Sequence, residues 1–233
     1  MNNRGNDGTA VIAAMRLEAR TARPFRRLGW RVVTGGVGPE RARIAASTLL
    51  DAGAKRLLIW GTAGSLNPDL EAGTLLVPAT VIDPQGRHHA PDADWRAALL
   101  ARIPVTMPFS ETALATVARP VADPPAKKAL HAATGAGAVD METASIAALA
   151  VAQGVPFAVV RAVVDPVKLA LPPVVLAAIS DRFLAPEVAL RLLGRPQDLP
   201  AVLALGRALR HARHNLSAFA RAVAAAGEDR GLY

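Results

Sequence analysis

The stretch that decides the fold is GAVDMETASIAALAVAQGVPFAVVRAVVDP, residues 137–166. Its alanine-rich first half predicts a helix over residues 141–153, with Gly154 placed to end it. Residues 156–164 are apolar at almost every position, which is typical of a central strand buried on both faces. A helix followed directly by such a strand is the repeating unit of an α/β domain.

The same alternation continues toward the N-terminus. Residues 9–14 and 30–34 predict strands, and a helix is expected from Pro39 to about residue 52, because proline is accommodated at the first helical position. Residues 56–60 predict a buried strand that runs into the glycine turn GTAGSL, residues 61–66. The pattern therefore predicts the α/β class.

The remaining segments complete this prediction. We expect a strand at residues 74–82, helices at residues 92–102 and 126–133, and two or three helices after Pro166, where prolines recur. Neither an internal repeat nor a low-complexity linker divides the chain. The sequence therefore predicts a single domain over residues 1–233 with a helical C-terminal part at about residues 173–225.

Composition limits the function classes. The chain has 233 residues, 52% of them hydrophobic, which is enough for one sizeable core. A net charge of +8 invites a nucleic-acid partner, but only 4% of the residues are aromatic and the basic residues are spread along the chain. We expect no nucleic-acid partner, and an anionic membrane surface stays open as an alternative.

The chain contains no cysteine, so disulfides and thiolate metal sites are excluded. The first 15 residues hold too short an apolar run for a signal peptide. Nowhere does the chain approach the roughly 20 apolar residues of a spanning helix. We expect a cytoplasmic protein, with attachment to the inner face of the membrane as an alternative.

Acidic residues stand at the two ends of the deciding stretch. Asp165 ends the expected strand, and ligands of open α/β sheets bind at the carboxyl ends of strands. Asp140 and Glu142 flank the start of the expected helix, where a carboxylate is favoured whatever its role, so helix capping explains them equally well. Arg161 lies inside the apolar strand, and we expect it to be paired with an acid.

Five segments, in order and with compatible spacing, carry a resemblance to a known family. They are VIAAMRLEA (11–19), GGVGPERARIAA (35–46), GTAGSL (61–66), VDMETASIAALA (139–150) and VVRAVVDP (159–166). Together they resemble the purine nucleoside phosphorylase and methylthioadenosine nucleosidase superfamily. The resemblance implies a three-layer αβα fold around a central, mixed, twisted sheet. It also implies a homo-oligomeric enzyme that cleaves the bond between a purine and a ribose without a cofactor.

The resemblance assigns roles to individual residues. Asp165 matches the acid that donates a proton to the purine N7, for which burial must raise its pKa. Glu142 matches the acid that holds the ribose hydroxyls, and Met141 the residue that packs against the sugar. Glu18 matches the acid that orients or deprotonates the attacking water. Thr62 stands where the family has a serine that touches the attacking group.

The identity of the nucleophile stays open between phosphate and water. Gly38, before the helix that starts at Pro39, and Gly64 offer backbone N–H groups suited to phosphate or to ribose oxygens. Arg41 and Arg43 match phosphate geometry, but solvation at the surface explains them equally well. We predict phosphorolysis with phosphate as co-substrate; hydrolysis of methylthioadenosine or S-adenosylhomocysteine-like nucleosides is the alternative. We expect no metal site.

The C-terminal third supports a narrower identification. PPVVLAAISDRF (172–183) and residues 191–223, together with the 32–46 block, resemble the hopanoid-associated phosphorylase. That resemblance implies adenine release from adenosylhopane, a nucleoside with a lipid tail, in hopanoid biosynthesis. Apolar residues recur every three or four positions from Val202 to Val223, with arginines between them, which predicts a helix packed on the sheet with a solvated basic back. Contact with an anionic membrane is the alternative.

Two other function classes remain to be weighed. A dinucleotide-binding oxidoreductase needs a glycine-rich turn after the first strand, and VIAAMRLEA (11–19) has none. A non-catalytic, basic membrane-surface protein is consistent with the charge alone.

The family often has a phenylalanine that stacks on the base, but residues 116–124 contain none, so the purine-contacting residues are not named.

Overall fold

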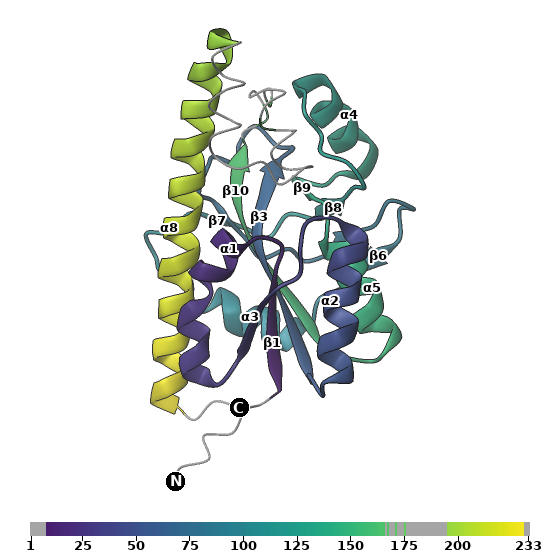
Figure 1. Cartoon of the computed structure of the whole chain (residues 1–233), viewed down its shortest axis with the longest axis vertical. Helices are drawn as coiled ribbons and strands as arrows, with labels where there is room; N and C mark the ends of the chain where they lie inside the picture. The colour runs from purple at the N-terminus through teal and green to yellow at the C-terminus, as the bar shows by residue number, and fades with distance from the viewer. Residues whose placement is uncertain (1–7, 166, 168–170, 172–174, 176–194, 231–233) are drawn as a thin grey trace.

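A computed structural model describes residues 8–165, 167, 171, 175 and 195–230 (Figure 1). The strands in the described part are β1 Thr9–Ala13, β2 Arg31–Thr34, β3 Arg56–Ser65, β4 Leu75–Leu76, β5 Val81–Ile82, β6 His88–His89, β7 Phe109–Ser110, β8 Leu114–Thr116, β9 Ala138–Asp140 and β10 Phe157–Asp165. The helices are α1 Arg16–Thr21, α2 Pro39–Asp51, α3 Ala93–Leu100, α4 Pro124–Thr134, α5 Thr143–Ala152 and α8 Leu199–Arg230, with 3-10 turns η1 Arg23–Leu28 and η2 Pro196–Asp198.

All of these strands belong to one mixed sheet. The long strands β3 and β10 run parallel at its centre, and β1 and β2 continue the parallel part beside β3. The short strands β4 and β9 pair antiparallel with β10 and β3. Because the parallel strands end at one edge, Asp165 and Gly64 come to lie opposite each other there. The predicted mixed, twisted sheet is confirmed.

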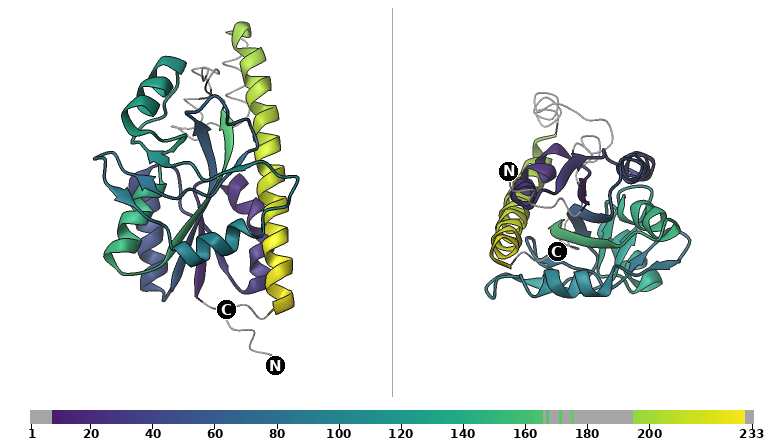
Figure 2. Two further views of the ribbon diagram at one scale, coloured as in Figure 1. Left: turned by 180° about the vertical axis from the view of Figure 1, so that it is seen from behind. Right: turned by 90° about the horizontal axis from the view of Figure 1, so that it is seen from below.

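Helices cover both faces of this sheet, which gives three layers (Figures 1 and 2). Alternate residues of β3 point to opposite faces, as the two-residue period of a strand requires. Leu57 and Ile59 pack in the core under α2 and α5. Leu58 and Trp60 pack in a second core under α3, α8 and η1. The predicted three-layer αβα architecture is therefore confirmed.

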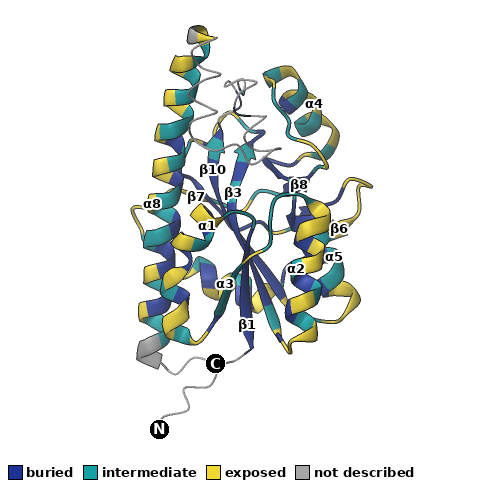
Figure 3. Cartoon of the chain, viewed as in Figure 1, coloured by how far each residue is buried: buried dark blue, intermediate teal, exposed yellow. Residues whose placement is uncertain are grey.

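The long helix α8 covers the second face, and Figure 3 shows buried residues along its length. The buried positions are apolar, among them Ala212, Leu216 and Phe219. Phe219 is fully buried, and its ring stacks on Trp60 with centroids 6.2 Å apart. Arg207, Arg210 and Arg221 lie on the exposed side. The predicted packing with a solvated basic back is confirmed for this helix. No helix among the described residues has both the length and the apolar character needed to cross a membrane.

Three sequence-based boundaries were wrong, each for a local reason. The expected glycine turn at residues 61–66 is mostly the end of β3, because neighbouring strands on both sides keep residues 61–65 in the ladder. The expected strand at residues 74–82 is split into β4 and β5 around Pro78, which has no N–H to donate. The helix expected from residue 141 begins at Thr143. The helices expected between residues 173 and 194 lie outside the described residues.

Candidate active site

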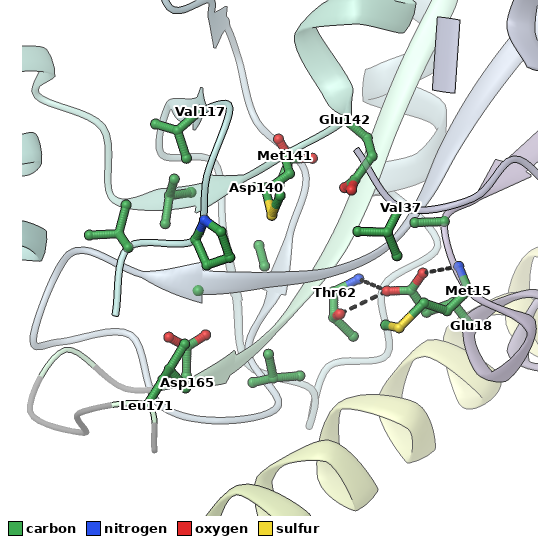
Figure 4. Close-up of a pocket in the computed structure, with 17 residues that line it drawn as sticks. Met15, Glu18, Val37, Thr62, Val117, Asp140, Met141, Glu142, Asp165 and Leu171 are labelled. Carbon is green, nitrogen blue, oxygen red and sulfur yellow. Dashed lines mark hydrogen bonds between the residues drawn. The ribbon is translucent and has the colours of Figure 1, made fainter. Parts of the chain in front are cut away.

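A cavity of about 140 Å³ opens at the carboxyl ends of β1, β3 and β10, beside the start of α5. Figure 4 shows four acids around it: Glu18 lies on one side, Asp165 on the opposite side, and Asp140 and Glu142 between them. The predicted site residues that line it are Glu18, Thr62, Gly64, Met141, Glu142 and Asp165. The structure thus brings together side chains from α1, β3, β10 and the β9–α5 connection.

Glu18 is fixed by hydrogen bonds on both carboxylate oxygens. Its Oε1 accepts from the Thr62 backbone N–H at 2.8 Å and from the Thr62 hydroxyl at 2.7 Å, and its Oε2 accepts from the Met15 N–H at 3.0 Å. The preceding residue in β3 is Gly61, where a Cβ would lie 2.8 Å from Oε1 and 2.6 Å from the Arg161 guanidinium. Glycine at this position therefore lets the carboxylate reach the strand.

Glu142 lies at the N-terminus of α5 and crosses to the start of α2. Its Oε1 accepts a hydrogen bond of 2.9 Å from the Gly38 N–H. Burial is the largest influence on its carboxyl group and raises the pKa, and the nearby Asp140 raises it further. Arg161 and the Gly38 N–H oppose this rise, and the resulting pKa is about 7. Glu142 therefore changes charge near neutral pH.

A buried polar network supports Glu142 from behind. Arg161 forms an ion pair with Asp140 through Nη2, which also donates to the Thr143 hydroxyl at 2.8 Å. Asp140 accepts from the Thr116 hydroxyl at 2.7 Å and caps α5 through the Thr143 N–H. The expected pairing of Arg161 with an acid is confirmed, and Asp140 is both a helix cap and the partner of this arginine.

Asp165 ends β10 and lies against Gly64, where a Cβ would be 2.8 Å from Oδ1. Its Oδ2 is 2.7 Å from Nζ of Lys127, a fully buried residue of α4. Burial raises the pKa of Asp165, and Lys127 lowers it; the net effect is a raised pKa. This is the direction that the proton-donor role requires.

Sequence reasoning missed Lys127 as a site residue. No motif contains it, and the ion pair joins two elements that are distant in the sequence. One signal was present, because Lys127 stands three positions before Leu130 in an expected helix, on the side that packs inward. A lysine at an inward-facing helical position requires a buried partner.

The predicted phosphate ligands do not reach the cavity. Arg41 is exposed, with its side chain over Gly36, and Arg43 pairs with Glu40 at 3.0 Å on the surface. The Gly38 N–H, which was expected to face phosphate or ribose, donates to Glu142 instead. None of the described residues that line the cavity is an arginine or a lysine. The described residues also contain no cluster of three or more histidine and acidic side chains that could hold a metal.

The wall nearest Asp165 is apolar. Val117, Pro120 and Val121 come from the segment after β8, and Leu171 closes the same side (Figure 4). This is the segment that lacks the family's phenylalanine, so aliphatic side chains and a proline take its place. Apolar side chains with a few polar groups are the usual lining of a small-molecule site.

Comparisons with known proteins agree with this architecture. A Helicobacter pylori 5′-methylthioadenosine/S-adenosylhomocysteine nucleosidase with 5′-methylthioadenosine in its active site has a TM-score of 0.72 at 17% identity, over 94% of this chain and 98% of that one. Futalosine hydrolase of the same species has a TM-score of 0.69 at 18% identity, over 92% and 96%.

A Neisseria meningitidis nucleosidase, also described as acting on 5′-methylthioadenosine and S-adenosylhomocysteine, has a TM-score of 0.68 at 17% identity, over 92% of this chain and 97% of that one. No curated protein sequence matches the chain. The sequence model of the phosphorylase superfamily matches residues 29–182, which is well over half of the chain. As its five segments predicted, the chain belongs to the phosphorylase superfamily.

Proposed function

We propose that this protein cleaves the N-glycosidic bond of a 5′-substituted adenosine and releases adenine. The observation that carries the proposal is the opposed placement of Asp165 and Glu18 across one cavity, with Met141 and Glu142 between them (Figure 4). The purine lies at the apolar end beside Asp165, and the ribose lies under Met141 and Glu142. The Helicobacter pylori nucleosidase of similar fold, which holds 5′-methylthioadenosine, supports this choice of substrate.

In the proposed mechanism, the protein separates charge along the cavity. As the bond between C1′ and N9 breaks, its electron pair moves onto the purine, and the ribose becomes positive. Asp165 donates a proton to N7, and burial favours this role because it raises the pKa of the carboxyl group despite the opposing effect of Lys127. The carboxylates of Glu142 and Glu18 stabilise the positive sugar, because fixed charges act strongly in a site from which water is excluded.

Water is the nucleophile that this geometry favours. The carboxylates of Glu18 and Glu142 line the cavity, and none of its described lining residues is an arginine or a lysine, so the site would repel a phosphate dianion. Glu18, held by Thr62, is placed to accept a proton from water as the oxygen bonds to C1′. The products are then adenine and the free sugar. Phosphorolysis, which the sequence predicted, would require a cationic side chain to bind the phosphate. That side chain would have to come from outside the described residues that line the cavity, for example from a second subunit.

The decisive experiment measures adenine release from 5′-methylthioadenosine, with and without phosphate. We expect release without phosphate and a free sugar as the second product, and a loss of about 100-fold or more in kcat for Asp165→Asn, the scale of general acid catalysis. A sugar 1-phosphate formed only with phosphate would establish phosphorolysis. Equal rates for wild type and Asp165→Asn would refute the proposed role of Asp165. If neither protein released adenine, the enzymatic function would be refuted and the basic membrane-surface protein would be left as the alternative.

The finer substrate assignment rests on the C-terminal resemblance. We propose adenosylhopane as the physiological nucleoside, used in hopanoid biosynthesis by a cytoplasmic homo-oligomer at the inner face of the membrane. The exposed arginines of α8, among them Arg207 and Arg210, and the exposed Leu203 are suited to such a surface. Adenosines with 5′-alkyl chains of increasing length test this assignment, and kcat/KM should rise with chain length.

A further inference from the structure

A buried lysine lies behind the acid that is proposed to protonate the purine. Lys127 has no exposed surface, and its Nζ is 2.7 Å from Oδ2 of Asp165. It belongs to α4, whose start is fixed by Asp123, since the Asp123 carboxylate accepts from the Ala126 N–H at 2.8 Å. The ammonium group is therefore carried by an anchored helix and held against the wall of the cavity.

Burying an ammonium group costs several kcal/mol unless it is well paired. An apolar side chain of similar length would fill the same volume without this cost. Asp165, with which Lys127 forms an ion pair, is a group that lines the cavity. This placement indicates a role in the chemistry of Asp165.

We propose that Lys127 is a positioning residue for Asp165: it holds Oδ2, presents Oδ1 to the purine N7 and stabilises the carboxylate left after proton transfer. The inference rests on the proposed function. In the step itself, the proton moves from Oδ1 to N7, and the electron pair of the C1′–N9 bond moves to the base. Adenine leaves as a neutral molecule, Asp165 remains as a carboxylate beside the ammonium, and water restores its proton afterwards.

The balance of forces on Asp165 supports this role. Burial raises the pKa of its carboxyl group, which keeps the proton available but makes the group a weaker acid. Lys127 lowers the pKa and so opposes part of this effect. General acids work best when the pKa lies near the operating pH, because both protonation and proton transfer are then favourable. The lysine thus keeps a buried acid strong enough to act.

The first test replaces the cation. For Lys127→Met we expect kcat for adenine release to fall about 10- to 100-fold, which is less than the roughly 100- to 10,000-fold that general acid catalysis contributes, because Asp165 itself is kept. The basic limb of the pH profile should move to higher pH, because Asp165 loses the charge that lowers its pKa. Lys127→Arg should recover part of kcat and return the limb toward its wild-type position. Lys128→Met, the same change at the adjacent exposed position, should behave as wild type.

The second test separates proton donation from a purely structural role. A 4-nitrophenyl riboside releases 4-nitrophenolate, which leaves without a proton. Lys127→Met should therefore hydrolyse this substrate at nearly the wild-type rate. In an Asp165→Asn background, Lys127→Met should add little further loss for the nucleoside, because the lysine acts through the missing acid. A structural defect would instead slow both substrates and add to the loss in the double variant.

The outcomes distinguish the two proposals. Absence of adenine release by the wild type would overturn the proposed function itself. A slow Asp165→Asn together with a Lys127→Met variant of wild-type rate and pH profile would overturn the role of Lys127 alone. If Lys127→Met folds poorly, Lys127→Arg compared on the two substrates decides: equal slowing on both overturns the proposal, and slowing confined to the nucleoside supports it.

Discussion

Gly64 shows how a residue without a side chain controls the chemistry of a neighbour. It lies in β3 opposite the end of β10, and the Asp165 carboxyl group occupies the space where a side chain would be. The backbone of Gly64 does not have a positive φ, unlike that of Gly61, so any residue can adopt its conformation. A substitution at Gly64 therefore tests only how closely the Asp165 carboxyl group approaches β3, because it adds no backbone strain.

Gly64→Ala should displace Asp165. The added Cβ would lie 2.8 Å from Oδ1 and 3.1 Å from Oδ2, and the short aspartate must move away from it. We expect kcat for adenine release to fall about 100-fold, since a misplacement of about 1 Å can cost that much. Gly206→Ala, whose added Cβ would lie 4.0 Å from the Arg210 guanidinium, is the control and should keep full activity. Equal activity of the two variants would contradict the close contact between Gly64 and the Asp165 carboxyl group.

At the scale of elements, α8 joins the C-terminal part to the central sheet. Its inner face packs on β10, β4 and η1, and Asn215 donates a hydrogen bond of 2.9 Å to the Gly73 carbonyl. The aromatic rings of Phe25, Trp30 and Trp60 form one cluster with Phe219 of α8. The helix thus covers the apolar face beneath which the site strands lie.

Phe219→Ala should remove a large part of the apolar contacts between α8 and the sheet. Truncation of a fully buried phenylalanine typically lowers the free energy of unfolding by about 3–5 kcal/mol, because it removes apolar contacts and leaves a cavity. Denaturant unfolding of the purified variant measures the loss. Leu203→Ala, at a position of the same helix that is 51% exposed, should change the unfolding free energy by less than about 1 kcal/mol. Similar losses for the two variants would show that α8 packs differently.

The elements differ in how well the sequence predicts them. α2 and β10 follow from local signals, namely the proline at the start of α2 and a continuous apolar run in β10. The end of β3 does not, because residues 61–65 stay extended only through pairing with distant strands. Asp165, Glu142 and Glu18 were named through a family resemblance, whereas the ion pair of Lys127 has no local signature.

For the whole molecule, buried carboxyl groups link stability to pH. Burial first of all raises the pKa of Glu142 to about 7 from an ordinary 4.5, and it also raises the pKa of Asp165. The folded state therefore holds protons that the unfolded chain releases, and stability falls as pH rises from about 4.5 to 7.

Asp83 acts in the opposite direction. Burial raises its pKa, but hydrogen bonds, chiefly from Arg87, lower it to about 2, so its contribution is lost as pH falls below 3.8.

Glu142→Gln should make the protein more stable and less active. The glutamine oxygen can still accept the Gly38 N–H bond, while the cost of a buried negative charge disappears. The gain at pH 8 should be at most about 3.5 kcal/mol, since the pKa rises from 4.5 to about 7 and one pKa unit corresponds to about 1.4 kcal/mol. Melting curves between pH 5 and pH 8 measure it: the melting temperature of the wild type should fall over this range, and that of Glu142→Gln should fall less.

The exposed Glu71→Gln is the matched control for that experiment and should follow the wild-type curve. If Glu142→Gln followed it too, the buried carboxyl group would not be the source of the pH dependence. Activity should change in the opposite sense, because an amide lacks the negative charge that stabilises the positive ribose in the proposed mechanism. A gain in stability with a loss of kcat would show that the buried carboxyl group of Glu142 serves catalysis at a cost in stability.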